Sequence, residues 1–364
     1  MEIGLVGLPN VGKSTLFNAL ARASADASNY PYCTIDPNIA VVEVPDERLD
    51  RLGGLLNPEK LTHPLLKFVD IAGLARGASK GEGLGNMFLS HIRDVDAVAH
   101  VVRCFEDPGV VHVEGEIDPV RDVEAVETEL FLSDLEVVDR RLSKISKIAR
   151  SGDAKARKEA EFLECVRASL DEGKVFDAGH LEDPDLEHEL GGLRLLTSKP
   201  SLFVANVGED AASAATAECV ARLEALAGKR RAAVLPVSAK LEAEFAELPP
   251  EEAAPLLRAF NFDQCALDRF VRACYGLLEV ITFFTIKGEE TKGWTVSKGT
   301  GVRKAAGKIH TDMYDKFVCA EVVAFDELMS SGSMQKAREN GLARTEGKEY
   351  IVRDGDVILI KFGR

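Results

Sequence analysis

The chain has 364 residues, of which 46% are hydrophobic and 29% charged, and its formal net charge is −15. This length allows two or three domains with a sizeable buried core, and the composition is typical of a globular protein. The sequence has no apolar run of about 18 residues, so we expect no membrane span and no membrane partner. Its seven cysteines are scattered without a C-x-x-C pair, which favours reduced thiols, and no secretion signal precedes the first strand-like run. We therefore expect a cytoplasmic protein, and a monomer.

The negative charge is unevenly distributed along the chain. Between Arg140 and Lys158 there are eight basic residues and one acidic residue, and a smaller basic excess runs from Glu279 to His310. The overall charge argues against general coating of nucleic acid, whereas a local basic segment can contact phosphates. A solvated surface without a partner explains such a run equally well.

Short apolar runs alternate with helical patterns in the first third of the chain, and two similar runs follow much later. This alternation predicts an α/β domain with a mostly parallel sheet that is covered by helices on both faces. The strand-like runs are Ile3–Val6, Ile39–Val44, Leu65–Val69, Ala97–Val102, Ser201–Ala205 and Ala233–Val237.

The gap between the fourth and fifth of these runs has a different pattern. Apolar residues recur there at spacings of three and four, first from Val123 to Ala149 and again from Ala156 to Leu170. The turn sequence Ser151-Gly152-Asp153 separates the two stripes. We expect an antiparallel helical hairpin over residues 121–194, inserted into a domain formed by residues 1–120 and 195–276, with the basic run at its tip.

The last part of the chain, residues 277–364, predicts a separate small α+β domain. Glycines punctuate it, and Thr282–Ile286 and Tyr350–Val352 are strand-like. The second of these runs leads through the tight-turn sequence Arg353-Asp354-Gly355-Asp356 into a further strand-like run, Val357–Phe362.

The strongest functional signal is the segment from Gly7 to Ser14, which fits G-x-x-x-x-G-K-[ST] between a strand and a helix. In such a loop the backbone N–H groups and the helix N-terminus face phosphates. Lys13 is expected against the β- and γ-phosphates, and Ser14 is expected to ligate Mg²⁺. The phosphate-binding residues are therefore predicted to be Asn10, Val11, Gly12, Lys13, Ser14 and Thr15.

Companion residues follow in the order that a phosphate site requires. Asp70 ends the third strand-like run and Thr34 precedes the second, so both can supply Mg²⁺ ligands beside Ser14. Gly73, three residues after Asp70, can offer its amide to the γ-phosphate and take part in hydrolysis. The sequence thus predicts a magnesium-dependent P-loop nucleoside triphosphatase.

Two departures from the GTPase pattern bear on the base and on the attacking water. Leu74 stands near the position where Ras-type GTPases have a water-orienting glutamine, and it cannot form that hydrogen bond. The N-K-x-D motif is replaced by Asn206-Val207-Gly208-Glu209, so the aspartate that reads guanine is missing. Ser238 and Ala239 occupy the place of a base-contacting S-A-K loop. These residues predict a preference for ATP over GTP.

Taken in order, these motifs closely resemble the YchF or Obg-like ATPase family, and the resemblance covers essentially the whole chain. It implies a G domain, an inserted helical hairpin and a C-terminal TGS domain with a β-grasp fold. It also implies a slow ATPase that associates with ribosomes. The matching segments are Asn10–Thr15, Phe68–Leu74, Lys80–Asn86, His100–Phe105 and Ala306–Asp312.

The resemblance also implies roles for three single residues. Asn10 is similar to an asparagine linked to K⁺-assisted hydrolysis, and Phe105 to an aromatic residue that packs on adenine. His112 is similar to a mobile histidine that orients water where the glutamine is missing. Ordinary core or loop positions would explain Phe105 and His112 as well.

Two other functions remain open from the sequence. One is a stress or redox regulator in which hydrolysis is secondary, since Cys33 lies in the predicted switch loop. The other is a GTPase with relaxed base specificity. If the hairpin tip contacts ribosomal RNA, the residues expected to do so are Arg140, Arg141, Lys144 and Lys147.

Overall fold

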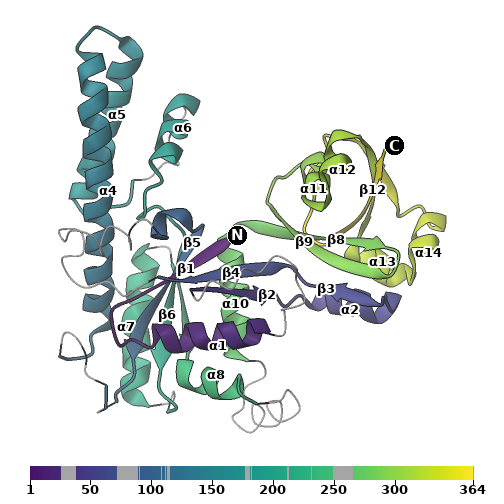
Figure 1. Cartoon of the computed structure of the whole chain (residues 1–364), viewed down its shortest axis with the longest axis horizontal. Helices are drawn as coiled ribbons and strands as arrows, with labels where there is room; N and C mark the ends of the chain where they lie inside the picture. The colour runs from purple at the N-terminus through teal and green to yellow at the C-terminus, as the bar shows by residue number, and fades with distance from the viewer. Residues whose placement is uncertain are drawn as a thin grey trace. The chain divides into compact units, whose positions relative to one another are not determined.

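The computed structural model describes residues 1–25, 38–71, 89, 91–107, 109–110, 112, 115–176, 181, 183–210, 213–230, 232–248 and 265–363. The chain forms two compact units (Figure 1). One comprises Met1–Ala40 and Lys67–Leu267, and the other comprises Val41–Leu66 and Asp268–Arg364. Within the described ranges the strands form two sheets of six.

The sheet that lies mainly in the first unit contains all six strands that the sequence predicts. Its order is β2-β4-β1-β5-β6-β7, and the strand pairs from β4 to β7 are parallel. Every residue of β5 is buried, because a central parallel strand is covered on both faces. The prediction of a mostly parallel sheet is confirmed. The strands are β1 (Glu2–Val6), β2 (Ile39–Glu43), β4 (Leu65–Asp70), β5 (Ala97–Cys104), β6 (Ser201–Val207) and β7 (Ala233–Val237).

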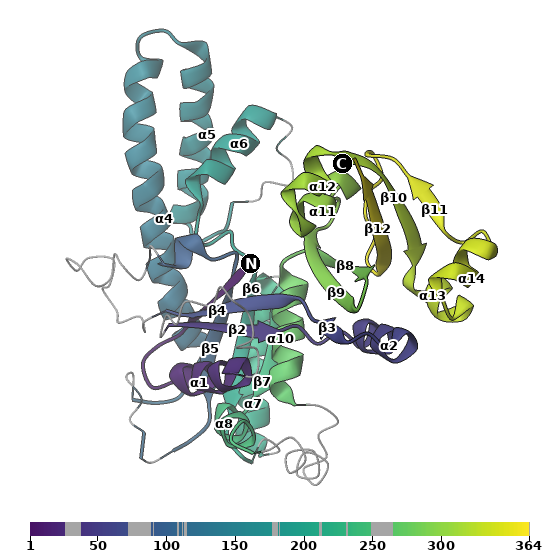
Figure 2. The same cartoon turned by 45° about the vertical axis from the view of Figure 1, so that its right-hand side comes forward.

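Helices cover this sheet and begin where the strands end. Helix α1 (Lys13–Ala25) follows β1 directly and packs against α8 (Ala239–Phe245), as Figure 2 shows. Helix α7 (Ala214–Arg230) packs through Leu223 and Leu226 on the apolar residues of β5 and β6. The carboxyl ends of the parallel strands therefore meet at one edge, where ligands of α/β proteins bind.

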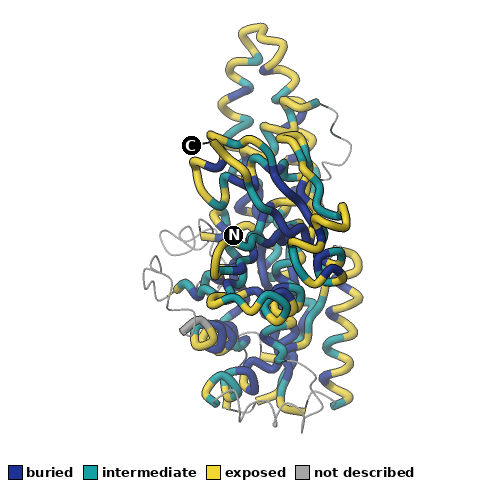
Figure 3. The backbone as a smooth tube through the Cα atoms, turned by 90° about the vertical axis from the view of Figure 1, so that its right-hand side faces the viewer, coloured by how far each residue is buried: buried dark blue, intermediate teal, exposed yellow. Residues whose placement is uncertain are grey.

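The insertion is an antiparallel pair of helices, as the two apolar stripes predict. Helix α4 (Pro119–Ala149) is capped by Asp118, and α5 (Ala154–Asp171) is capped by Asp153. The shorter α6 (Pro184–Leu193) adds apolar side chains to the core of the hairpin. Much of the far end of the hairpin is exposed (Figure 3).

The second unit is built on a mixed sheet in the order β11-β10-β12-β8-β9-β3. Its core joins Phe283 of β8 and Val322 of β10 to Val302 of α11. The strands are β3 (Lys60–Thr62), β8 (Val280–Lys287), β9 (Glu290–Ser297), β10 (Phe317–Ala324), β11 (Arg344–Glu346) and β12 (Asp356–Phe362). The helices are α2 (Glu47–Leu56), α10 (Ala266–Leu277), α11 (Val302–Ile309), α12 (Thr311–Asp315), α13 (Phe325–Ser331) and α14 (Met334–Glu339).

The unit boundaries differ from the predicted domain bounds in two segments. Residues 268–276, predicted to belong to the first domain, are grouped with the second unit. The sequence interpretation assigns residues 41–66 to the first domain, whereas the structure groups them with the second unit. Leu49 and Leu52 of α2 are fully buried in a cluster with Phe284, and β3 pairs in parallel with β9. These partners lie more than 200 residues away, so local periodicity cannot reveal them.

The predicted strand over Tyr350–Val352 is wrong. Ile351 forms only an isolated bridge with Gly301, and the Tyr350 hydroxyl instead donates to Asp356 at 2.8 Å. The turn before β12 is present, with Gly355 at φ 86°, a value that favours glycine. Strand β12 pairs with β10 and β8.

Candidate nucleotide-binding site

The loop between β1 and α1 has the backbone that a phosphate-binding loop needs. Asn10 and Gly12 have φ values of 63° and 89°. A Cβ atom at Gly12 would lie 2.1 Å from Nδ2 of Asn206, and one at Gly7 would lie 2.6 Å from the carbonyl oxygen of Val101. These close contacts require glycine at both positions. The loop ends at the N-terminus of α1, where backbone N–H groups are available to bind phosphate.

Asn206, at the end of β6, ties this loop to the loop after β7. Its Nδ2 donates to the carbonyl oxygen of Val11 at 2.8 Å, and its Oδ1 accepts from the amide of Ala239 at 3.0 Å. The side chain is buried, so both hydrogen bonds are shielded from water. One asparagine thus positions the phosphate-binding loop and a base-side loop relative to each other.

Lys13 and Asp70 form an ion pair at the first turn of α1. Only 8% of Lys13 is exposed, so contacts with the protein set the position of its ammonium group. Ser14 follows on the same turn, and hydroxyl and carboxylate oxygens are the ligands that Mg²⁺ prefers. Ser14 and Asp70 therefore have the ligand chemistry that a magnesium site needs.

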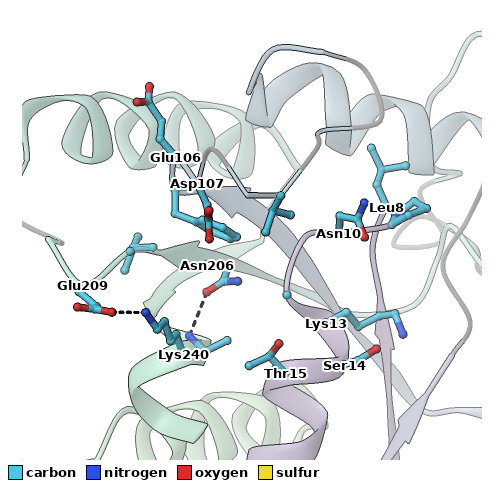
Figure 4. A pocket seen from close by; sticks show the side chains of 17 residues that line it. Leu8, Asn10, Lys13, Ser14, Thr15, Glu106, Asp107, Asn206, Glu209 and Lys240 are labelled. Atoms are coloured by element: carbon cyan, nitrogen blue, oxygen red, sulfur yellow. Dashed lines mark hydrogen bonds and ion pairs between the residues drawn. The ribbon is translucent and has the colours of Figure 1, made fainter. Parts of the chain in front are cut away.

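A cavity of about 810 Å³ extends from this turn between the loops that follow β5, β6 and β7. Figure 4 shows Lys13, Ser14 and Thr15 on one side of it, Glu209 and Lys240 on the other, and Asn206 between them. The volume suits a nucleotide-sized ligand. Of the predicted base and phosphate contacts, the lining contains Asn10, Gly12, Lys13, Ser14, Thr15, Phe105, Asn206, Val207, Glu209 and Ala239.

The other two predicted contacts act indirectly in this structure. Val11 is buried and offers its carbonyl to Asn206, while Ser238 caps α8 by accepting from the amide of Leu241 at 3.5 Å. The sequence interpretation missed several lining residues, of which Lys240 was signalled by its place in the S-A-K segment. The missed residues are Leu8, Pro9, Glu106, Asp107, Val110, Gly208 and Lys240.

Arg103, at the end of β5, organises the loop that carries Phe105. Its guanidinium group donates to the carbonyl oxygens of Phe105 at 3.1 Å, Val110 at 3.0 Å and Asp107 at 3.4 Å. It also lies 4.6 Å from the centre of the Phe105 ring. Arg103 is buried, so this loop is anchored to the sheet and presents Phe105 to the cavity.

The base side of the cavity contains an ion pair that the sequence interpretation did not foresee. Lys240 Nζ lies 2.6 Å from a carboxylate oxygen of Glu209. Glu209 is the residue that replaces the aspartate of the N-K-x-D motif. This hydrogen bond raises the pKa of the Lys240 ammonium group. The Glu209 carboxylate is thus engaged by a cation from the neighbouring loop.

His112 does not belong to the cavity lining. It is buried, and its Nε2 lies 2.9 Å from Oδ2 of Asp122 on α4. Asp122 also accepts from Arg121 at 3.3 Å. The predicted water-orienting residue is therefore held against the base of the hairpin.

Several residues of the sequence interpretation lie outside the described part of the chain. They include Cys33 and Thr34 in the predicted switch loop, Gly73 and Leu74 after Asp70, and the matching segment Lys80–Asn86.

Comparison with known proteins agrees with this architecture. Residues 2–138 match the MMR_HSR1 family, described as a 50S ribosome-binding GTPase, and residues 280–363 match YchF-GTPase_C, described as a protein of unknown function. The "Ribosome-binding ATPase YchF" of Bacillus subtilis (strain 168) is 47% identical over 100% of this chain and 99% of the relative. The chain belongs to the YchF/Obg-like ATPase family. Another member, the "Obg-like ATPase 1" of Oryza sativa subsp. japonica, is 42% identical over 100% of this chain and 92% of the relative.

A solved YchF structure shares the whole fold. The YchF GTPase of Schizosaccharomyces pombe superposes with a TM-score of 0.89 at 35% identity, covering 99% of this chain and 97% of that one. The predicted fold class is therefore confirmed for this YchF-family chain. Among the described helices, none has the length and apolar character needed to span a bilayer.

Proposed function

We propose that this chain binds and hydrolyses ATP in preference to GTP and acts as a nucleotide-dependent switch on ribosomes. The observation that carries the choice of base is Glu209, which stands where GTPases have the guanine-reading aspartate and whose exposed carboxylate contacts Lys240. Without that aspartate, the site lacks the acceptor that favours the N1–H and amino groups of guanine. The names of the relatives, "Ribosome-binding ATPase YchF", support both halves of the proposal.

The preference for ATP is testable by calorimetry in the presence of Mg²⁺. We expect ATP to bind at least about fivefold more tightly than GTP, a difference of about 1 kcal/mol. The double variant Lys240→Ala/Glu209→Asp should narrow this difference, because it frees a carboxylate of the length that reads guanine. Adding Val207→Lys recreates the whole N-K-x-D motif, but Val207 is buried, so the double variant is the cleaner test.

Lys240→Arg is the matched control, since it keeps a cation opposite Glu209 and should keep the preference for ATP. Equal affinities of the wild type for ATP and GTP would contradict the proposal.

For hydrolysis, we propose that Lys13 stabilises the charge that develops on the phosphates. Ser14, Asp70 and Thr34 would hold Mg²⁺, which supplies further positive charge there. The amide of Gly73 would donate to the γ-phosphate. His112 would orient the attacking water after it separates from Asp122, because Leu74 cannot form that hydrogen bond.

A potassium ion at Asn10 is the further part of this proposed mechanism. We expect hydrolysis to be faster in K⁺ than in Na⁺ at equal ionic strength, because a bound cation stabilises transition-state charge. Asn10→Gly is the appropriate variant, since the backbone there has a φ of 63°, which glycine adopts without strain. Steady-state rates in the two salts should become equal in this variant. A wild-type rate that does not depend on the cation would remove K⁺ from the mechanism.

For ribosome association, we propose the hairpin tip as the contact surface. Part of its basic run is already neutralised, because Arg141 lies 2.6 Å from both Glu159 and Glu189, and Lys158 pairs with Asp183. Arg140 donates to the carbonyl oxygen of Glu136 at 3.1 Å. Four other exposed cations of the run form neither an ion pair nor a side-chain hydrogen bond with another described residue, and they are the better candidates for phosphate contacts. These are Lys144, Lys147, Arg150 and Arg157.

We expect the protein to co-sediment with ribosomes or their subunits, less strongly as salt rises, because phosphate contacts release counterions. Changing these four cations to glutamate should weaken binding by more than about tenfold and leave ATP affinity intact. The control changes four exposed cations of the second unit to glutamate, which alters the net charge by the same amount and should weaken ribosome binding less. These are Lys298, Lys304, Lys308 and Lys348. Full retention by the hairpin variant would show that its tip is only a solvated surface. A ribosome-bound role would place the protein in the cytoplasm.

A further inference from the structure

A second cavity, of about 600 Å³, lies in the first unit and shares no lining residue with the nucleotide cavity. Its floor is the face of β5 and β6 that carries His100 and Phe203, and α4 forms a wall through Val126 and Leu130. Both floor residues belong to the early part of their strands, whereas the nucleotide loops follow the carboxyl ends. Its size is that of a small-molecule site.

His100 is the unusual feature of this cavity. Only 4% of it is exposed, and its ring meets the Phe203 ring edge-on with centroids 5.8 Å apart. Within the described part of the chain, no hydrogen bond to the His100 side chain accompanies this ring contact. Burial lowers the pKa of His100 to about 4, so the imidazole is neutral at physiological pH. A neutral imidazole has one N–H donor and one nitrogen acceptor, so a ligand in the cavity that His100 lines can hydrogen-bond with either nitrogen.

The remaining lining separates into an apolar interior and a basic mouth. Val98, Leu130 and Phe131 contribute apolar side chains to the lining, and the exposed cations Lys174 and Lys229 mark its mouth. Arg230 pairs with Glu127 at 3.0 Å, and Lys199 donates to the carbonyl oxygens of Arg93 and Val95.

Two lysines at the mouth are more available. Lys229, in the last turn of α7, is exposed and forms no ion pair with another described residue. Lys174 is also exposed, and among the described residues its ammonium group pairs with its near neighbour Glu172. A negatively charged group at the mouth would therefore meet cations that the fold does not use internally.

We propose that this cavity binds a small organic anion with a flat, largely apolar body. The body packs on Phe203 and Leu130, a polar atom of it bonds with His100, and the anionic group lies between Lys229 and Lys174. This arrangement satisfies the buried imidazole, and it places each part of the ligand against side chains of matching chemistry.

The probe for the test is 1-anilinonaphthalene-8-sulfonate, a flat apolar anion that fluoresces when it leaves water. The full chain is titrated with it in the presence of saturating Mg²⁺ and ADP, which block the nucleotide cavity. We expect one saturable site per chain.

Leu130→Trp fills the cavity and should weaken binding of the probe by at least about tenfold. Leu132→Trp is the matched control, because Leu132 lies on the same helix, is exposed and does not line the cavity. It should bind the probe as the wild type does. His100→Phe keeps the ring but removes both polar atoms, and Lys229→Glu reverses the charge at the mouth, so both should weaken binding by severalfold.

Wild-type affinity in Leu130→Trp would overturn the proposal. If that variant does not fold, as judged by circular dichroism, His100→Phe and Lys229→Glu decide the matter, and unchanged affinity in both would overturn it. ATP affinity should stay at the wild-type value in every folded variant, so failure here is distinguishable from failure of the proposed ATPase function.

Discussion

Replacing Lys13 by alanine is expected to lower the rate of ATP hydrolysis by about 100- to 1,000-fold. The residue is 8% exposed and contacts Asp70, so its charge acts in a site with little solvent screening. Without it, no lysine lies at the first turn of α1 to balance the charge of the phosphates and of the Asp70 carboxylate. Single-turnover hydrolysis measures the loss, and calorimetry measures how much of it is lost binding.

Lys67→Ala is the matched control for this prediction. Lys67 lies on β4, the strand that ends at Asp70, but it is half-exposed and its partner is Glu2 at 3.4 Å. Exposed ion pairs contribute about 0 to 1 kcal/mol, so this variant should hydrolyse ATP at the wild-type rate. Rapid hydrolysis by Lys13→Ala would contradict the assignment of this loop as the phosphate site.

The second large effect is expected at His112. His112→Ala should reduce kcat by about 100-fold while the dissociation constant for ATP stays within about threefold, because the proposed contact is made only in the transition state. His112→Gln should recover part of kcat, since glutamine can also orient water. Pre-steady-state kinetics and calorimetry separate the two quantities.

The pairing of His112 with Asp122 requires a control for stability. Removing the histidine leaves a buried carboxylate, which can cost about 3–5 kcal/mol, so thermal unfolding of each variant must be measured. His63→Ala disrupts another His–Asp pair, in which His63 lies 3.2 Å from Asp50, and should leave hydrolysis unchanged. If His112→Ala turns over at the wild-type rate, the residue serves only as a structural partner of Asp122.

The elements and the phosphate loop were predictable because their signals are local. Apolar runs in β5 and β6 mark strands covered on both faces, and the spacing of apolar residues in α4 and α5 marks two helices that share a core. A Cβ atom at position 7 or 12 would lie 2.6 or 2.1 Å from a neighbouring atom, so glycine is required at both positions. The glycines of the sequence motif are the local signal of this requirement.

Partners that lie far apart in the chain could not be predicted in this way. Periodicity tells which face of α2 is buried, but not that it packs with Phe284 in the second unit. The composition gives the number of charges in the basic run. It does not reveal that Arg141 is neutralised by Glu189 of another helix.

By itself, the sequence determined that this chain has a P-loop, a parallel sheet and a helical hairpin, because contiguous residues dictate each of them. Only the tertiary structure decided which side chains meet. It joined Asn206 to Val11 across 195 residues, placed Lys240 on Glu209, and buried His112 against Asp122. The physical reason is that a hydrogen bond or ion pair depends on two positions in space, and the fold sets their separation after the local pattern has been satisfied.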